Sequence, residues 1–483
     1  MGAGAAGRQR QWTLALVTVA ALLESADQAL LPAVYREVGS ALGASPTALG
    51  SITLCRVFVM AVSYPLATCA AARHDRARVV AAGAFLWSVA TVLVGVSGTF
   101  LQMAIARGFN GVGLALVLPA IFSLVADYSD DATRGAAFGW VQTAQCLGYV
   151  LGRSLGLLLA PTSFLGGVPG WRLAFHALAL VSLLLAALTW LLAADPRPRS
   201  STKAASSTAA DLVLEAKAVM SVPTFWIVVA QGAAGCMPWA AFNFVAMWLE
   251  LEGFTHWETT LLTNLSSVAN ALGSLFAGFV GDPLARRFPN AGRVALAQVS
   301  TASTVPFAAV LLLALPGNAS AGAAYAVAFF FLGFVMPWSS VTTIYPIFAE
   351  IVPEKARTTV YALDKCFETV FAAFGAPVVG ILAESVFGYQ PTASGTSAVA
   401  DRENAAALGK AVFAEIAVPV TICCLTYSAL YCTYPEDRRR AQMDALQAEG
   451  EEQGGDCESR SSVATATAAA SLNQALLHGT SSS

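Results

Sequence analysis

Charged side chains are scarce in this sequence. Asp, Glu, Lys and Arg make up 12% of its 483 residues, roughly half of the share of about 25% in soluble proteins, whereas apolar residues reach 56%. This composition excludes a chain that exposes an ordinary charged surface to water along most of its length. The formal net charge is only −3, and no nucleic-acid partner is expected.

Signatures of catalysis are also missing. The sequence contains no phosphate-binding glycine loop, kinase motif or zinc-hydrolase motif, and no connecting segment is long enough to form a catalytic domain. Most of the nine cysteines fall within apolar runs, and none shows the spacing of metal ligands. We therefore expect a protein that is not an enzyme and has no metal site, cofactor or disulfide framework.

Long apolar runs are what the sequence does contain. Each has 19 or more residues, enough for a helix to cross a hydrocarbon core about 30 Å thick while satisfying its own backbone hydrogen bonds. We therefore predict an all-α, multi-pass integral membrane protein with twelve transmembrane helices. The runs cover residues 12–34, 47–71, 79–97, 101–126, 136–160, 173–193, 224–250, 259–281, 293–315, 321–350, 358–386 and 409–433.

Basic residues predict the orientation of these helices. Lys and Arg concentrate before the first run, in the segments after the even-numbered runs, and after the last run. The odd-numbered loops hold only Arg36, Arg172, Arg402 and Lys410. Because cytoplasmic segments carry the excess of Lys and Arg, both ends of the chain are predicted to be cytoplasmic.

The chain divides into two halves of six runs each. A segment rich in Pro and Ser separates them, which is typical of a linker, and the last segment is polar and without periodicity, which predicts disorder. The predicted parts are a cytoplasmic N-terminus (1–11), an N-terminal six-helix bundle (12–193), a cytoplasmic linker (194–223), a C-terminal six-helix bundle (224–433) and a disordered cytoplasmic tail (434–483).

Two charged motifs occur in both halves in the same order. The segment after the second run reads ARHDRARV, and the segment after the eighth reads GFVGDPLARRF. The fourth and tenth runs each end on an acid that is followed, after six residues, by an arginine. Such duplicated halves are typical of secondary transporters that bind their substrate between the halves. The motif residues are Asp75, Arg76, Arg78, Asp127 and Arg134 in the first half and Asp282, Glu350 and Arg357 in the second.

These motifs resemble those of the major facilitator superfamily over all twelve runs. The fourth run carries RGFNGVGLA, which begins with Arg107, and the fifth has the glycine spacing of the superfamily's antiporter motif, with Arg153 where the family has proline. The resemblance implies two pseudo-symmetric six-helix bundles and a solute transporter. More narrowly, ESADQALLPAVYREVG, FAEIVPEKARTTVYALDKCFE and YPEDRRRAQM resemble a land-plant group near the Spinster-like transporters, which implies a lipid-like or organic anionic solute.

The resemblance also implies a role for the charged motifs. In the superfamily they form a cytoplasmic latch that locks the outward-open state and breaks when the cytoplasmic side opens. The residues alone allow a second interpretation, in which the arginines only set the topology.

Ionisable residues inside the runs are the candidate functional site. An ionisable side chain in the bilayer costs about 2.5–3.5 kcal/mol on insertion scales, so it normally faces the bundle interior and pairs. In the first half, Glu24 and Asp27 could pair with Arg56, Arg107 or Arg153. We expect both acids to face the central cavity, Asp27 to couple protons, and a free arginine to attract an anionic group. The alternative is a structural ion pair between the first and fourth helices.

The second half offers another charged group. Asp364 and Glu368 are four residues apart and share a helical face, with Lys365 beside them. A gate ion pair and a coupling role both fit this spacing. Five polar or aromatic residues are candidates to line the cavity: Gln28, Trp239, Asn243, Asn270 and Trp338.

Together these features predict a secondary active transporter of a small organic or lipid-like solute that works by alternating access and is coupled to protons. Symport and antiport both fit. Two further alternatives remain: a lipid facilitator whose cavity opens sideways, and a non-transporting nutrient sensor on the same fold. The expected partners are the solute, protons and the lipid bilayer, and the chain is expected to be a monomer in the plasma membrane or in a vacuolar or endosomal endomembrane.

Overall fold

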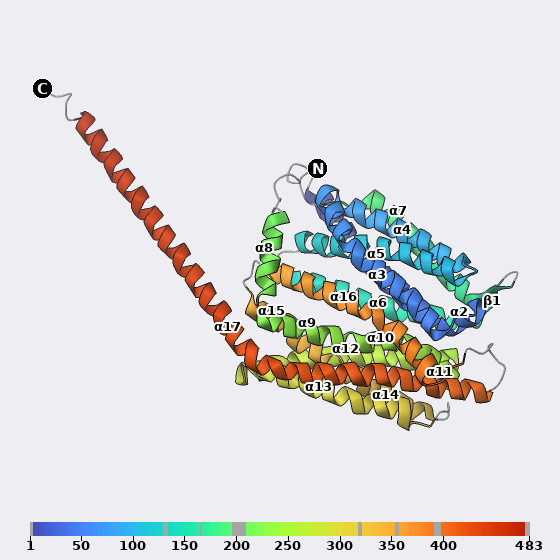
Figure 1. Ribbon diagram of the computed structural model, residues 1–483. Coiled ribbons are helices and arrows are strands. Elements are labelled where there is room, and N and C mark those ends of the chain that lie inside the picture. The colour runs from blue at the N-terminus through green and yellow to red at the C-terminus, as the bar shows by residue number, and fades with distance from the viewer. Residues whose placement is uncertain are drawn as a thin grey trace.

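The computed structural model describes residues 3–128, 134–164, 167–195, 209–316, 321–352, 357–390 and 398–478. This part of the chain is helical almost throughout (Figure 1). One small antiparallel hairpin pairs β1 (Ser163–Phe164) with β2 (Val168–Pro169), and its register places Ser163 opposite Pro169. The predicted all-α class is confirmed.

Helices of membrane-spanning length account for most of the described residues. Eleven of the described helices are long and apolar enough to cross a membrane. A further helix, α6, has 26 residues and is about 39 Å long at 1.5 Å per residue. Together they give the twelve spans that the apolar runs predict, and the chain is a multi-pass membrane protein.

Six of these spans form the first bundle. Within it α4 packs against α5 and α7, α3 packs against α5, and α1 packs against α6. The short helix α2 (Tyr35–Leu42) follows the first span and ends at Gly43, whose φ of 60° is left-handed and favours glycine. The spans are α1 (Ala3–Ala33), α3 (Pro46–Arg73), α4 (Arg76–Val96), α5 (Phe100–Tyr128), α6 (Arg134–Leu159) and α7 (Gly170–Leu192).

Several spans of the second bundle are interrupted helices. The first consists of three α-helical pieces joined through a 3₁₀ turn at Phe242–Phe244, and π-helical turns occur at Val310–Ala314, Ser340–Ile344 and Leu382–Val386. The α-helices are α9 (Pro223–Gly235), α10 (Met237–Ala241), α11 (Val245–Leu251), α12 (His256–Arg287), α13 (Gly292–Ala309), α14 (Gly322–Val335), α15 (Tyr345–Ile351), α16 (Arg357–Ile381) and α17 (Ala398–His478).

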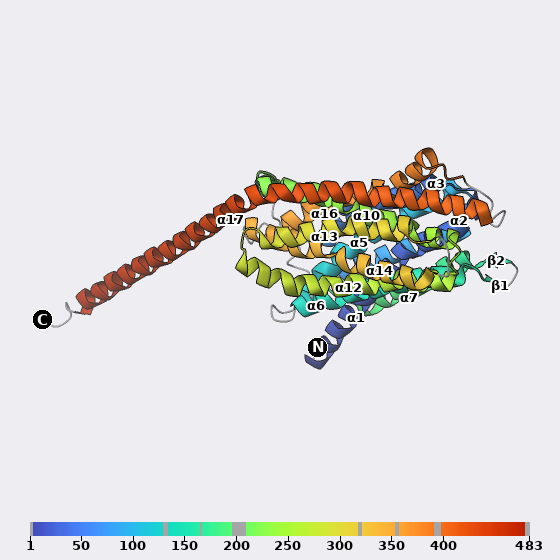
Figure 2. The same cartoon turned by 90° about the horizontal axis from the view of Figure 1, so that it is seen from below.

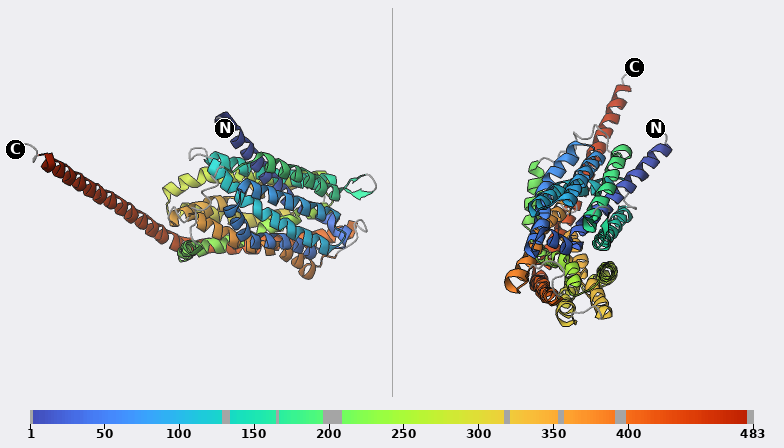
Figure 3. Two further views of the ribbon diagram at one scale, coloured as in Figure 1. Left: turned by 90° about the horizontal axis from the view of Figure 1, so that it is seen from above. Right: turned by 90° about the vertical axis from the view of Figure 1, so that its right-hand side faces the viewer.

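The two bundles lie side by side, as the view along the helices in Figure 3 shows. They contact each other where α3 packs against α16 and where α6 packs against α12. We call the end of the bundles at which α7 ends and α9 begins the linker end, because α8 (Ala209–Met220) lies there between them (Figure 1). The opposite end, which carries α2 and the hairpin, is the distal end.

Close contacts between the bundles occur at the distal end. A Cβ on Gly380, near the end of α16, would overlap the backbone of Thr47 at the start of α3, and one on Gly50 would meet the backbone of Ala376. Glycine at both positions lets the two backbones touch. The helix pair α3 and α16 is therefore joined where both helices reach the distal end.

The tail differs from its prediction. We expected disorder from residue 434, whereas α17 continues as a helix through His478 and projects away from the bundles (Figures 1 and 2). The physical reason is composition: Ala, Glu, Gln, Arg and Leu, which are frequent here, have high intrinsic helix propensity even where no periodic apolar face exists.

Candidate functional site

A buried ion pair lies at the centre of the first bundle. Arg107 of α5 donates from Nη1 to Asp27 Oδ2 of α1 at 3.0 Å, and both side chains are at most 1% exposed. The other oxygen, Asp27 Oδ1, accepts from Thr91 Oγ1 of α4 at 2.8 Å, and Asn110 Nδ2 donates to the same Thr91 hydroxyl at 3.1 Å. Both oxygens of this carboxylate are thus held, and the network joins three helices.

Glu24 extends the network by one helical turn. It is fully buried and accepts hydrogen bonds from Ser25 Oγ at 3.1 Å and from Gln28 Nε2. Arg56 of α3 is also buried and interacts electrostatically with Glu24 and Asp27, while its Nε and Nη1 have no hydrogen-bond acceptor among the described residues. The cluster therefore contains two acids and two bases.

Glycine spacing explains why α1 presents these acids to α3, α4 and α5. A Cβ on Gly148 or Gly152 of α6 would overlap the carbonyl oxygens of Leu22 and Ala26 on α1. Helix α6 therefore packs directly on the α1 backbone at those residues. Because successive helical residues are turned by about 100°, Asp27 then points away from α6 and into the first bundle.

This arrangement corrects one prediction. We expect Glu24 and Asp27 to face the central cavity. Neither residue lines the cavity between the bundles or the smaller cavity in the second bundle. The cavity-lining face of α1 is formed by Ser25, Ala29 and Pro32. The acids avoid the bilayer by lying inside the first bundle, where Asp27 pairs with Arg107.

The central cavity lies between the bundles and has a volume of about 630 Å³. Its walls come from α1 and α6 on one side and from α10, α11, α12 and α14 on the other, and they are mostly apolar and aromatic. Three of the candidate lining residues, Trp239, Asn243 and Asn270, lie in its wall. Gln28 and Trp338 do not belong to its lining; Trp338 packs on the rings of Phe276 and Phe334.

Arg153 is the charged residue of this cavity. Its Nη1 donates to the Thr263 carbonyl at 3.0 Å and contacts Ser267 Oγ at 3.4 Å, both on α12, and its guanidinium lies 4.8 Å from the centre of the Tyr149 ring. No described carboxylate forms an ion pair with it. The cavity thus contains a positive charge that is oriented by neutral groups and remains available to an anion.

A second, smaller cavity of about 270 Å³ lies in the second bundle and shares Trp239 and Met336 with the first. Lys365 and Glu368 line it and form an ion pair of 2.5 Å. Asp364 is only 1% exposed, does not line either cavity, and its carboxylate oxygens have no hydrogen-bond donor among the described residues. Of the two acids on this helical face, Glu368 is the one that reaches a cavity.

The first charged motif ties two helix ends together at the linker end. Asp75 caps α4 by accepting from the backbone of Ala77 at 2.9 Å and of Arg78 at 3.3 Å. Arg76 donates from Nε and Nη2 to the two oxygens of Asp195, just beyond α7, at 2.9 and 2.6 Å. Both of these side chains are buried. No sequence signal pointed to Asp195, because the motif pattern ends before α7.

The second motif has a similar charge cluster. Glu350 accepts from Tyr434 Oη and pairs with Arg438 Nε at 3.0 Å, and Arg293 Nε lies 3.9 Å away. These partners come from α17 and α13, so this cluster also stays within its own bundle. The remaining predicted latch side chains, those of Asp127, Arg134, Asp282 and Arg357, lie outside the described part of the structure.

At the distal end, polar contacts cross between the bundles. Arg36 of α2 donates to the Glu250 carbonyl at 3.0 Å and forms an ion pair with Asp401 of α17 at 3.2 Å. The Thr47 backbone N–H donates to Glu384 at 2.7 Å. The sequence analysis did not predict these contacts, because it used Arg36 only to assign the orientation of the helices.

Glu37 belongs to the same region and lies outside the membrane-spanning segments. Burial raises its pKa to about 7, and the nearby Glu250 carboxylate adds to the increase. The contact between the bundles thus includes a carboxyl group, that of Glu37, whose pKa is raised to about 7.

Comparisons with known proteins agree with this architecture. The family model described as Major Facilitator Superfamily matches residues 17–376. The cis,cis-muconate transport protein of Acinetobacter baylyi is 25% identical over 291 residues, which are 57% of this chain and 68% of that protein. An MFS-type efflux pump of Mycolicibacterium smegmatis is 26% identical over 442 residues, which are 89% of this chain and 95% of that one.

A solved structure shares the fold. It is a bacterial homolog of the human lysosomal transporter Spinster in an inward-facing and unoccupied conformation, with a TM-score of 0.76 and 18% identity. The match covers 89% of this chain and 98% of that chain. The two-bundle, twelve-helix architecture is therefore a known one.

Proposed function

The chain belongs to the major facilitator superfamily and is a membrane transporter rather than an enzyme, and from this premise we propose that it carries an organic anion by proton-coupled alternating access. The observation that carries the proposal is Arg153, which lines the central cavity without a described carboxylate partner. The 25% identity with a cis,cis-muconate transport protein agrees with an anionic organic solute.

The cavity fits such a solute in size and character. Its volume of about 630 Å³ lies within the roughly 300–1,000 Å³ of small-molecule sites, which are mostly apolar with a few placed polar groups. Arg153 would bind the carboxylate or phosphate of the solute. Asn243 and Asn270 line the same cavity. The aromatic wall at Trp239 and Phe242 would cover the hydrocarbon part.

Proton coupling is assigned to the Asp27–Arg107 network. Protonation of Asp27 would remove its charge and leave the Arg107 guanidinium buried without a counter-charge. This unpaired charge is costly, which favours a shift of α1 against α5. Ser25 and Ala29 of the same helix line the cavity, so a shift of α1 changes the substrate site. This geometry supports coupling through helix movement, with no contact between Asp27 and the substrate.

The contacts at the distal end support an inward-open state. If the linker end is cytoplasmic, the bundles meet at the outer side through Arg36, Thr47 and Gly380. The Arg76–Asp195 and Glu350–Arg438 pairs then stay within their own bundles, as a latch does after it has broken. Three further points stay predictions: the choice between symport and antiport, the membrane in which the protein works, and the monomeric state.

A lipid-like solute is the second candidate, favoured by the largely apolar cavity wall. Both candidates would place their charged group on Arg153, so they differ in the apolar part that the cavity wall covers. Protein in proteoliposomes can be offered cis,cis-muconate, and separately a single-chain phospholipid, with and without an imposed pH gradient.

Uptake that depends on the pH gradient is expected for one of these probes. Arg153→Gln should raise the KM for that probe by roughly 10- to 100-fold, because a hydrogen bond to a charged group contributes about 1.5–3 kcal/mol. The matched control is Arg440→Gln, which removes an exposed arginine of α17. An unchanged KM in Arg153→Gln would refute the anion site.

A further inference from the structure

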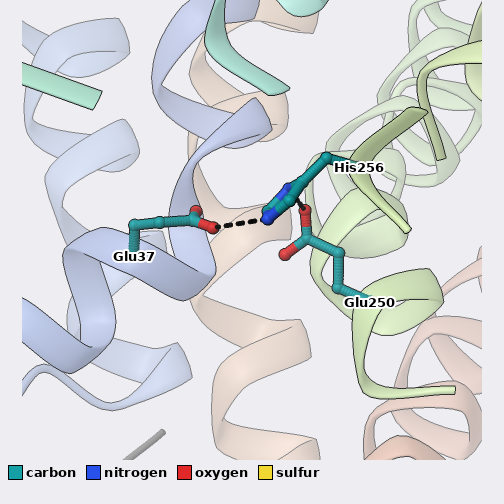
Figure 4. Close-up of side chains that lie close together, drawn as sticks. All are labelled: Glu37, Glu250 and His256. Atoms are coloured by element: carbon teal, nitrogen blue, oxygen red, sulfur yellow. Dashed lines mark ion pairs between the residues drawn. The ribbon is translucent and has the colours of Figure 1, made fainter. Parts of the chain in front are cut away.

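Three side chains with metal-binding atoms meet at the distal end, where the bundles touch (Figure 4). Glu37 comes from α2 of the first bundle, while Glu250 lies in the last turn of α11 and His256 begins α12 of the second. His256 Nδ1 lies 2.8 Å from Glu250 Oε1, and His256 Nε2 lies 3.7 Å from Glu37 Oε1. One ligand atom from each residue falls within 4.8 Å of the others.

The charge of this cluster is not balanced by its surroundings. Glu250 has a side chain that is 2% exposed, and its Oε2 has no hydrogen-bond donor among the described residues. Glu37 Oε2 is also buried and, within the same described part, has no donor. Arg36, next in sequence to Glu37, directs its guanidinium to the Glu250 backbone carbonyl and to Asp401. A buried carboxylate oxygen without a donor is costly, so the site favours a cation.

We propose that Glu37, Glu250 and His256 bind a divalent transition-metal ion, with Zn²⁺ the best match, and thereby join the two bundles at the distal end. Zinc is bound by imidazole nitrogen and carboxylate oxygen at about 2.0–2.2 Å in tetrahedral sites. Such an ion holds its ligand atoms about 3.4 Å apart, and one ligand atom from each of the three residues already lies within 4.8 Å of the others. Three protein ligands leave one position for water.

Metal binding would select one conformation of the transporter. The three ligands are together only while α2 lies against α11 and α12, so opening of the distal end separates Glu37 from the other two. A ligand that binds one state better shifts the equilibrium toward that state. Zinc should therefore stabilise the distally closed form and slow any cycle that requires opening there.

Zinc binding to the purified full-length protein tests the site directly, with Zn²⁺ alone and no transport substrate. The wild type is expected to bind one ion that a chelator removes, with a rise in thermal unfolding temperature on binding. Glu37→Gln and His256→Gln should each weaken binding by at least about tenfold, since even partners outside the ligand shell contribute that much. His74→Gln is the matched control, because His74 is exposed at the linker end.

A second variant separates loss of the site from loss of the fold. His256→Cys keeps a zinc ligand in the thiolate and should retain binding where His256→Gln does not. Absence of binding to the wild type would overturn the proposal, as would equal binding by wild type, Glu37→Gln and His256→Gln. Because no solute is involved, failure here would leave the proposed transport function untouched.

Discussion

Arg153 of α6 donates a hydrogen bond across the interface between the bundles to the carbonyl oxygen of Thr263 on α12, at 3.0 Å. One turn of α6 is therefore both a contact between the two halves and a wall of the central cavity. A neighbouring bond, from Asn264 Nδ2 to Ser154 Oγ at 2.9 Å, joins the same helices. A substrate anion that draws Arg153 toward itself would weaken the contact that holds the halves together.

The distal ion pair should control access from that side. Arg36→Ala removes the contacts with Asp401 and the Glu250 carbonyl. A partly exposed pair contributes up to about 1 kcal/mol, which corresponds to a change of up to about fivefold in the open population. We expect faster labelling of a cysteine introduced at Ala29 by an impermeant reagent applied at the distal side.

Arg402→Ala provides the control for that experiment, because Arg402 is an exposed neighbour on α17. It should label at the wild-type rate. Equal labelling in Arg36→Ala and the wild type would show that the ion pair does not hold the distal end closed.

Asp27→Asn tests the coupling role. The amide keeps the shape of the carboxylate and mimics its protonated form, so solute exchange across the membrane should persist while accumulation driven by a pH gradient is lost. If the pair with Arg107 is only structural, the variant instead leaves a buried arginine unpaired, which costs about 3–5 kcal/mol and lowers the amount of folded protein.

Abundance and pH-driven uptake measured on the same samples distinguish these outcomes. Asp444→Asn, at an exposed position of α17, should change neither. A well-folded Asp27→Asn protein with normal pH-driven accumulation would exclude Asp27 as the coupling acid.

The α1–α6 contact predicts a stability difference between two identical substitutions. Gly152→Ala places a methyl group against the Ala26 carbonyl oxygen, and such overpacking typically costs about 1–3 kcal/mol. Gly278→Ala in α12 meets no atom within 4 Å and should be neutral or stabilising by up to about 1 kcal/mol, because alanine favours the helix.

Thermal unfolding in detergent compares the two variants. Gly152→Ala should unfold at a lower temperature than the wild type and Gly278→Ala at the same or a higher one. A reversed order would show that α1 and α6 do not pack as closely as described.

Topology is open to a direct test. An epitope tag inserted in the hairpin between β1 and β2 should be accessible only from the non-cytoplasmic side, because the flanking loop carries few basic residues. A tag after residue 440 should be accessible only from the cytoplasm. Accessibility of the hairpin tag from the cytoplasm would invert the predicted orientation.

The sequence by itself determined the architecture. Apolar runs of membrane-spanning length can only form helices, because lipid offers no partner for backbone polar groups, and the recurring charged motifs marked the two halves. It also marked Glu24 and Asp27 as acids that need a basic partner among Arg56, Arg107 and Arg153, since unpaired charges inside a bilayer are costly. The polar tail shows the limit of composition, because a segment without an apolar face can still have high helix propensity.

Only the tertiary structure decided which way these side chains point. Contact of Gly148 and Gly152 with the α1 backbone turned Asp27 into the first bundle and left Ser25 on the cavity face, an outcome that depends on which helices pack together. In the same way, Asp195 met Arg76, and Glu37 met His256, across 119 and 219 residues of sequence. No local spacing encodes such pairs, because they form only when distant helix ends are brought to the same side of the bundle.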